Sequence, residues 1–274
     1  MGNGETAIFP ISIFKVKDGV NFKPGDPNYD LYRYSMEVTA KRLFPNYTFL
    51  DAPYNLKYYK EGDPDTEVAT MGCRTRVIGN VNGPEIVTGR GNCSFSTINL
   101  PRLAILSDHN IDKFFELLDK YLDMAERQLY ERFEYQGSKK VKNFPFLMGE
   151  GFWLGSEKLG PEDTLEEVIK QGTLSIGFIG LAEALIALIG KHHGESAEAQ
   201  ELGLKIIGHM RDFCDDATKR RHLNYTLLAT PAEGLTGKLI RKDKKDFGII
   251  PGVTDREYYT NSVHKRHVAL YGNI

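Results

Sequence analysis

The sequence has 274 residues, of which 41% are hydrophobic and 26% charged, and its formal net charge is -2. These proportions are ordinary for a globular protein, and the near-neutral charge argues against nucleic acid or an anionic membrane surface as the partner. No apolar run reaches the roughly 18 residues that a membrane-spanning helix needs.

Three cysteines, Cys73, Cys93 and Cys214, are widely spaced and form no CxxC pair. An odd number without such a pair argues against a disulfide framework and against a zinc site built by this chain. The first residues lack the basic and apolar segments of a secretory signal. We therefore expect a reducing, cytoplasmic setting and no metal-ligating residues.

Predicted strands and helices alternate in the first part of the chain. Residues 7–16 form an apolar run typical of a strand buried on both faces, residues 31–43 have amphipathic helical spacing, and residues 46–52 indicate a second buried strand. Residues 53–91 are rich in Gly, Pro, Asp and Asn, so we expect long loops around short extended pieces. So long an irregular region in a compact domain is usually functional.

The alternation continues to the end of the chain. We expect a strand at 93–100 ending in a turn at Pro101, a helix at 108–135 capped by Asp108, a short helix at 163–170 capped by Asp163, a strand at 172–181, helices at 181–190 and 195–220, and a strand at 223–234 leading into a helix start. The polar stretch after Gly234 predicts a loop. This order of elements predicts an α/β sheet or barrel.

Polar and glycine residues follow three of the predicted strands, where ligands bind in α/β folds. Asn99 ends one strand, the glycines of "SIGFIGL" end another, and "ATPAEG" (229–234) follows a third. Backbone N–H groups at a helix start after "ATPAEG" would suit a phosphate. On these residues alone, an equally good interpretation is that Thr230 caps a helix with Pro231 in its first position.

Cys73 follows a glycine in "MGCRT". Gly72 permits a sharp bend, and the charges of Arg74 and Arg76 would favour the thiolate. A buried cysteine in a loop is the alternative that these residues leave open. Cys93 and Cys214 fall in predicted regular elements, where packing is the favoured role.

Five segments in fixed order carry a family resemblance. They are "MGCRTRV", "GRGNCSFSTINLPRLAI", "GTLSIGFIGLAEAL", "LNYTLLATPAEGLTGK" and "DKKDFGIIPGVTDREYYTNS". Together they resemble the large glycyl-radical subunit of the anaerobic (class III) ribonucleoside-triphosphate reductases, over residues 5–262. The resemblance implies part of a ten-stranded α/β barrel with a central finger loop, so that residues 1–274 form one partial catalytic barrel domain.

The resemblance also implies roles for particular residues. The family reduces ribonucleoside triphosphates to deoxyribonucleoside triphosphates for DNA synthesis, using a thiyl radical that removes the ribose 3′ hydrogen. By position in "MGCRT", the radical cysteine is Cys73, and by position in "TINLPRL" the residue that binds the ribose hydroxyls is Asn99. The implied phosphate contacts are Thr230, Ala232, Glu233 and Gly234.

The implied partners lie outside these residues. They are a radical-SAM iron–sulfur activating protein that makes the glycyl radical, a structural zinc, ATP and dNTP effectors, a formate or thiol reductant, and a second copy of the full-length subunit. The match ends after "YYTNS", with neither a glycyl-radical motif nor a four-cysteine zinc site, and the ATP-cone region is not matched. We therefore expect a fragment that is inactive alone.

Two other functions fit the same residues. The chain could be an inactive nucleotide-binding remnant, or it could belong to another glycyl-radical enzyme. Enzymes of that second kind usually carry paired cysteines at the loop tip, and Cys73 has no such neighbour.

Overall fold

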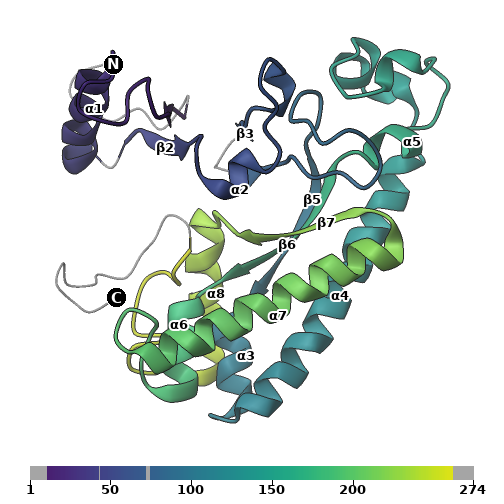
Figure 1. Cartoon of the computed structure of the whole chain (residues 1–274). Coiled ribbons are helices and arrows are strands. Elements are labelled where there is room, and N and C mark those ends of the chain that lie inside the picture. The colour runs from purple at the N-terminus through teal and green to yellow at the C-terminus, as the bar shows by residue number, and fades with distance from the viewer. Residues whose placement is uncertain (1–10, 43, 72–74, 262–274) are drawn as a thin grey trace. The chain divides into compact units, whose positions relative to one another are not determined.

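The computed structural model describes residues 11–42, 44–71 and 75–261 (Figure 1). The chain divides into two compact units, Met1–Arg90 and Gly91–Ile274, each with its own strands and helices. That residues 1–274 form one barrel domain stays a prediction.

The first unit contains two small sheets. In the first sheet, β1 (Ile13–Val16) and β2 (Asn46–Phe49) pair in parallel, and α1 (Tyr29–Arg42) connects them. Parallel neighbours require such a crossover. These elements confirm two strands and a helix in this part of the sequence, but the predicted burial of the strands on both faces is wrong, because most residues of β1 and β2 are only half-buried.

The rest of the first unit has short elements between loops, as its composition predicts. A four-residue helix, α2 (Pro53–Leu56), is followed by a 3-10 turn at Pro64–Thr66. The strands β3 (Thr70–Met71) and β4 (Thr75–Arg76) then pair antiparallel. Cys73 falls between these two strands in the sequence and lies outside the described residues.

The second unit is built on a three-stranded parallel sheet. Its strands are β5 (Asn92–Asn99), β6 (Thr173–Ile179) and β7 (Asn224–Ala229), in the order β5-β6-β7. The central strand β6 is buried over almost its whole length, which is typical of an apolar run in a parallel sheet. Because all three strands are parallel, their carboxyl ends lie along one edge.

Six α-helices accompany this sheet in the described residues, besides short 3-10 or π turns at Val141–Asn143, Pro145–Gly149 and Ser156–Lys158. The α-helices are α3 (Leu100–Ser107), α4 (Ile111–Gly137), α5 (Glu166–Ile169), α6 (Leu181–Ile189), α7 (Ala197–Arg221) and α8 (Glu233–Phe247). The long helices α4 and α7 run alongside the strands in Figure 1. One apolar core joins buried side chains of these helices, such as Leu118 and Ile206, to Ile176 of β6.

One predicted turn and two predicted helix caps are wrong. Pro101 does not end the strand in a turn but lies in the first turn of α3, where its missing N–H costs nothing. Asp108 ends α3 in the left-handed conformation, with φ of 53°, and the cap of α4 is Asn110, whose side chain accepts from Lys113 N at 2.9 Å. Asp163 does not cap α5, because its carboxylate accepts from Gly160 N at 2.7 Å.

The loop predicted after Gly234 is also wrong over its first part. Helix α8 occupies Glu233–Phe247, and only the segment that follows is irregular. Thr236, Ile240 and Asp243 are fully buried, and their spacing of four and three residues defines one face of a helix. The abundance of lysine in this stretch concealed that face.

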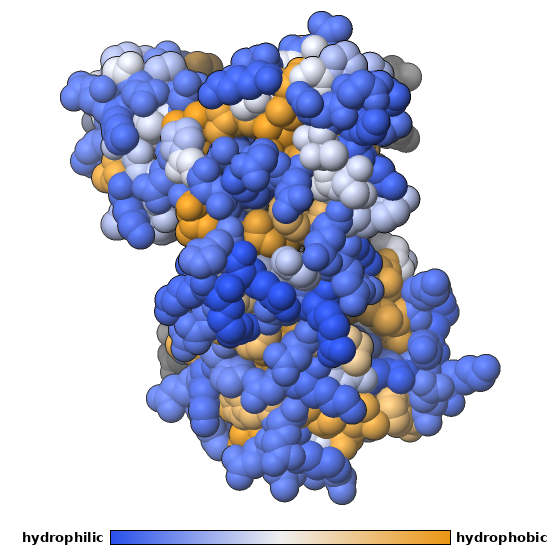
Figure 2. All heavy atoms as spheres, turned by 90° about the vertical axis from the view of Figure 1, so that its right-hand side faces the viewer, coloured by the Kyte–Doolittle hydropathy of each residue, from blue (hydrophilic) through white to orange (hydrophobic). Residues whose placement is uncertain are grey.

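Hydrophilic residues cover most of the face of the molecule in Figure 2, with hydrophobic patches between them. Such a mixture is normal for the surface of a folded domain. Among the helices that the structure describes, none is both long and apolar enough to cross a membrane.

Candidate active site

The carboxyl ends of β5, β6 and β7 bring two hydroxyl groups over a glycine. Thr97 Oγ1 and Thr230 Oγ1 are 3.0 Å apart, although 133 residues separate them in the sequence. Thr97 is the register partner of Gly177 on the central strand. A Cβ atom at position 177 would lie 2.0 Å from Thr230 Oγ1. Only glycine therefore leaves space for this pair.

The turn after β7 leads into α8 at the same edge. Thr230 is buried, and its backbone N donates to Phe178 O at 3.2 Å. The N-cap of α8 is Ala232, without a side-chain capping bond. Thr230 is thus not the cap, and the interpretation of Thr230 as a helix cap is wrong.

Consequently, the side chain of the capping residue accepts no hydrogen bond from the N–H groups in the first turn of α8. The first N–H groups of any helix lack partners within the helix and carry the positive end of its dipole. Gly234, in this turn, is exposed. Ala232 O accepts from Asn261 Nδ2 at 3.3 Å, which ties the cap to the irregular segment after α8. A turn of this kind can bind an anion.

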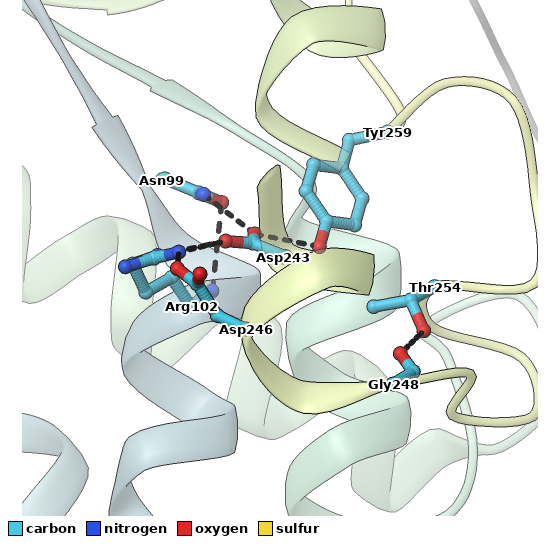
Figure 3. Close-up of polar contacts among 7 residues, drawn as sticks. All are labelled: Asn99, Arg102, Asp243, Asp246, Gly248, Thr254 and Tyr259. Carbon is cyan, nitrogen blue, oxygen red and sulfur yellow. Dashed lines mark hydrogen bonds and ion pairs between the residues drawn. The ribbon is translucent and has the colours of Figure 1, made fainter. Parts of the chain in front are cut away.

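Asn99 is the last residue of β5 and the N-cap of α3. Its Oδ1 accepts from Arg102 N at 3.5 Å, and its Nδ2 donates to Asp243 Oδ2 at 2.8 Å (Figure 3). Helix α8 thereby contacts the end of β5 through the side chain of Asp243.

Asp243 is fully buried and has four polar contacts (Figure 3). Its Oδ1 accepts from Arg102 Nε and pairs with Arg102 Nη2, both at 2.7 Å. Its Oδ2 accepts from Asn99 and from the Tyr259 hydroxyl, the latter at 2.7 Å. Burial, together with the bond to Asp243, raises the pKa of Tyr259 well above its usual value, so this phenol remains a hydrogen-bond donor. The Arg102 guanidinium also pairs with Asp246.

The segment after α8 is fastened to the start of α6. Glu183 is fully buried, and its Oε2 accepts from Thr260 N at 3.0 Å and from Thr260 Oγ1 at 2.7 Å. Its Oε1 pairs with Arg256. Gly180 N, at the end of β6, donates to Thr260 O at 2.6 Å. These contacts hold Tyr259 in place beside Asp243.

The structure brings most of the predicted site residues to one edge of the sheet. Asn99, Thr230 and Ala232 lie there, as does the start of α8 at Glu233 and Gly234. For Glu233 the structure describes only its place as the first residue of α8.

Three residues of this edge were not predicted from the sequence, namely Arg102, Asp243 and Tyr259. A signal for Asp243 was present. It shares the buried helical face with Thr236 and Ile240, and an acidic residue on such a face requires partners. Arg102 had no comparable signal, because Asp243 is 141 residues away. Tyr259 had none because it follows Asp243 by 16 residues, outside α8, in an irregular segment without periodic spacing.

Cys93 and Cys214, the two cysteines that the structure describes, lie in packed surroundings. Burial raises the pKa of Cys93 to about 12 and, with the Asp215 charge, that of Cys214 to about 12. Cys93 Sγ donates to Ile169 O at 3.4 Å. Both remain thiols, which agrees with the packing role expected for them. Within the described residues, no three His, Cys, Asp or Glu side chains are grouped so as to hold a metal ion.

Comparison with known proteins identifies a family. The family model for anaerobic ribonucleoside-triphosphate reductase matches residues 1–269. The anaerobic ribonucleoside-triphosphate reductase of Escherichia coli (strain K12) is 34% identical over 267 residues, which are 96% of this chain and 36% of the relative. The enzyme of the same name from Enterobacteria phage T4 is 33% identical over 270 residues and is covered to 42%. The chain thus spans less than half the length of these relatives.

Solved structures agree on the fold. The structure of the anaerobic ribonucleotide reductase from Thermotoga maritima with MES in the active site aligns with this chain with a TM-score of 0.59 and 17% identity. The alignment covers 92% of this chain and 37% of the Thermotoga maritima chain. The same reductase in complex with dATP and CTP matches with a TM-score of 0.55 and 18% identity. The predicted α/β fold with parallel strands is confirmed. The extent of the family match shows that this chain belongs to the anaerobic ribonucleoside-triphosphate reductases.

Proposed function

We propose that this chain contributes the substrate-binding edge and the radical cysteine of an enzyme that reduces ribonucleoside triphosphates to deoxyribonucleoside triphosphates for DNA synthesis. One observation carries the proposal. Asn99, Thr230 and the start of α8 meet at the carboxyl edge of a parallel sheet, in a chain of the reductase family. Ligands of α/β folds bind at this edge.

The start of α8 is the proposed site for the substrate phosphates. Its cap, Ala232, makes no side-chain bond to the N–H groups of the first turn, and N–H groups at such a helix start can bind phosphate oxygens. Gly234 leaves open space, because a Cβ atom there would meet no other atom within 4 Å. Thr230 holds the turn against the sheet through its hydrogen bonds to Thr97 Oγ1 and to Phe178 O.

Asn99 is the proposed contact to the ribose. An asparagine amide has two N–H donors and an oxygen with two lone pairs. Asp243 accepts one donor, and the Arg102 backbone N–H uses one lone pair. One donor and one acceptor position are thus left for ribose hydroxyls, which can both give and receive hydrogen bonds.

Cys73 is the proposed radical residue, by its place in the family motif. A hydrogen atom would pass from C3′ of the ribose to the Cys73 thiyl radical, so that a C–H bond breaks, an S–H bond forms and the unpaired electron moves to carbon. This step needs no proton transfer, so a lowered thiol pKa is not required. The 2′ hydroxyl would then leave as water with one added proton, a second proton and two electrons from formate or a thiol pair would complete the reduction at C2′, and the hydrogen on sulfur would return to C3′. An activating protein would supply the glycyl radical that generates the thiyl.

The complete enzyme is expected to include a structural zinc, ATP and dNTP effector sites, and a second subunit. The described residues offer no cluster of zinc ligands.

The phosphate site can be tested with CTP, the ribonucleotide named for the Thermotoga maritima complex. Glu233→Pro removes the first N–H of α8 at the position where proline is best tolerated, and Glu233→Ala keeps that N–H. We expect calorimetric titration of the 274-residue chain to show CTP binding about tenfold or more weaker in Glu233→Pro, as for one lost charge-assisted hydrogen bond. Equal affinities of the two variants would contradict the backbone contact.

The radical role is tested by activity. In a reductase polypeptide that contains these 274 residues, activated under anaerobic conditions, Cys73→Ser should abolish deoxynucleotide formation, because a hydroxyl cannot host the radical. Cys214→Ser is the matched control and should retain turnover, since Cys214 is fully buried in the core. Turnover by Cys73→Ser would refute the assignment.

A further inference from the structure

We propose that Asp243 is a positioning residue that fixes the orientation of the Asn99 amide, and so decides where the ribose meets a donor and where it meets an acceptor. This inference rests on the proposed role of Asn99. Asp243 itself is fully buried and belongs to α8, whose first turn is the proposed phosphate site.

The orientation follows from what each partner can donate. Asp243 Oδ1 faces the Arg102 guanidinium at 2.7 Å, and a carboxylate paired in this way only accepts hydrogen bonds. The Asn99 group that faces Oδ2 at 2.8 Å must therefore be the NH2 end. On the other side of the amide, the Arg102 backbone N–H can only donate, so it requires the Asn99 oxygen. Both neighbours select the same orientation.

The position of Asp243 is in turn determined from two sides (Figure 3). Arg102 from α3 binds one carboxylate oxygen, and Tyr259 from the segment after α8 binds the other at 2.7 Å. Tyr259 is fully buried, and a buried carboxylate is stable only when its oxygens are satisfied. Asp243 thus has one arrangement, which it imposes on Asn99.

Asp243→Asn should set the two neighbours of the Asn99 amide against each other. The new oxygen of residue 243 would face Arg102, which only donates, so the new NH2 group would face Asn99. Two NH2 groups cannot bond to each other, so Asn99 either loses its bond to residue 243 or turns its oxygen toward residue 243 and leaves the Arg102 N–H without that acceptor. The variant changes neither the size of residue 243 nor the contact of Arg102 with Asp246.

Nuclear magnetic resonance tests this without a ligand. In the 15N-labelled 274-residue chain, the side-chain NH2 signal of Asn99, assigned by its loss in Asn99→Ala, should show one downfield, slowly exchanging proton. Asp243→Asn should shift and accelerate this proton, whereas Asp246→Asn, which alters only an exposed partner of Arg102, should not. An unchanged Asn99 signal in Asp243→Asn would overturn the inference.

Nucleotide binding tests the consequence. The quantity to measure is the ratio of Kd values for 2′-deoxy-CTP or 3′-deoxy-CTP to that for CTP, which does not depend on how much of a variant is folded. We expect about a tenfold preference for CTP, the worth of one hydroxyl hydrogen bond, to disappear in Asp243→Asn and to persist in Asp246→Asn. The double variant Asp243→Asn/Asn99→Ala should resemble Asn99→Ala, because Asp243 acts through Asn99.

The outcomes separate the two proposals. If Asn99→Ala keeps the wild-type ratio, or no form of the chain distinguishes the nucleotides, the ribose role of Asn99 is wrong, and the amide signal alone decides whether Asp243 orients it. If Asn99→Ala loses the preference while Asp243→Asn keeps it, the proposed function stands and the positioning role of Asp243 is refuted.

Discussion

Replacing Gly177 by alanine is the most direct test of the sheet edge. Gly177 lies on the central strand β6 beneath the bond between Thr97 Oγ1 and Thr230 Oγ1. The new methyl carbon would lie 2.0 Å from Thr230 Oγ1 and 3.0 Å from Thr97 Oγ1. Both hydroxyls must move, and the end of β7 must move with Thr230.

The expected cost has two parts. Forcing an extra methyl group into a packed site costs about 1–3 kcal/mol, and losing the bond between the two threonines costs about 0.5–1.5 kcal/mol. We therefore expect Gly177→Ala to lower the free energy of unfolding by about 2–4 kcal/mol. Because Thr230 supports the start of α8, CTP affinity should fall as well.

Urea unfolding followed by circular dichroism measures the stability. Thr230→Ala removes the atom at 2.0 Å, so the double variant Gly177→Ala/Thr230→Ala should be more stable than the sum of the single losses predicts, by about 1–2 kcal/mol. Gly208→Ala is the control, since a Cβ atom there meets nothing within 4 Å and alanine favours the helix. Strict additivity of the two losses would refute the steric argument.

Three further predictions concern other parts of the chain. Asn110→Ala should lower the free energy of unfolding by about 1 kcal/mol in urea titrations, because the cap of α4 is lost. Arg90→Ala should accelerate hydrogen exchange of residues 77–90, because the buried Arg90 guanidinium binds three backbone carbonyl groups there. Iodoacetamide at about pH 8 should label Cys93 and Cys214 slowly, because raised pKa values keep thiolate scarce, and faster as the pH rises toward about 12.

Each of these three predictions has its own control. Asp108→Gly should not destabilise the chain as Asn110→Ala does, because Asp108 has a positive φ that glycine adopts freely. The exposed Arg33 should tolerate alanine without a change in the exchange of residues 77–90. Labelling mapped by mass spectrometry in urea should find Cys93 and Cys214 equally reactive, and rapid labelling of either in the native chain would contradict their burial.

The sequence predicted the strands of the second unit because their signal is local. The apolar run ending in "SIGFIGL" gave β6, and the polar and glycine residues after the strands marked the correct edge. The helix boundaries were harder to predict, since Asp108 and Asn110 are both good capping residues. Only the left-handed backbone of Asp108 shows that it ends α3 rather than beginning α4.

Helix α8 shows a second kind of limit. Its lysine-rich sequence is typical of a solvent-exposed segment. The buried face of the helix consists of Thr236, Ile240 and Asp243, and only Ile240 is apolar. A polar residue can occupy a buried face only if a partner satisfies it. The partners of Asp243, Asn99 and Arg102, are 144 and 141 residues away, so no local pattern could reveal them.

The sequence by itself determined the alternation of strands and helices, the family through its ordered motifs, and the residue types available for chemistry, because these depend on local order along the chain. The tertiary structure alone decided that Thr97 and Thr230 meet over Gly177, and that Asp243 holds Asn99 while Tyr259 holds Asp243. The threonine contact and the Asn99 contact join residues 133 and 144 positions apart, and all three contacts form only when the fold brings these groups together and excludes water from between them.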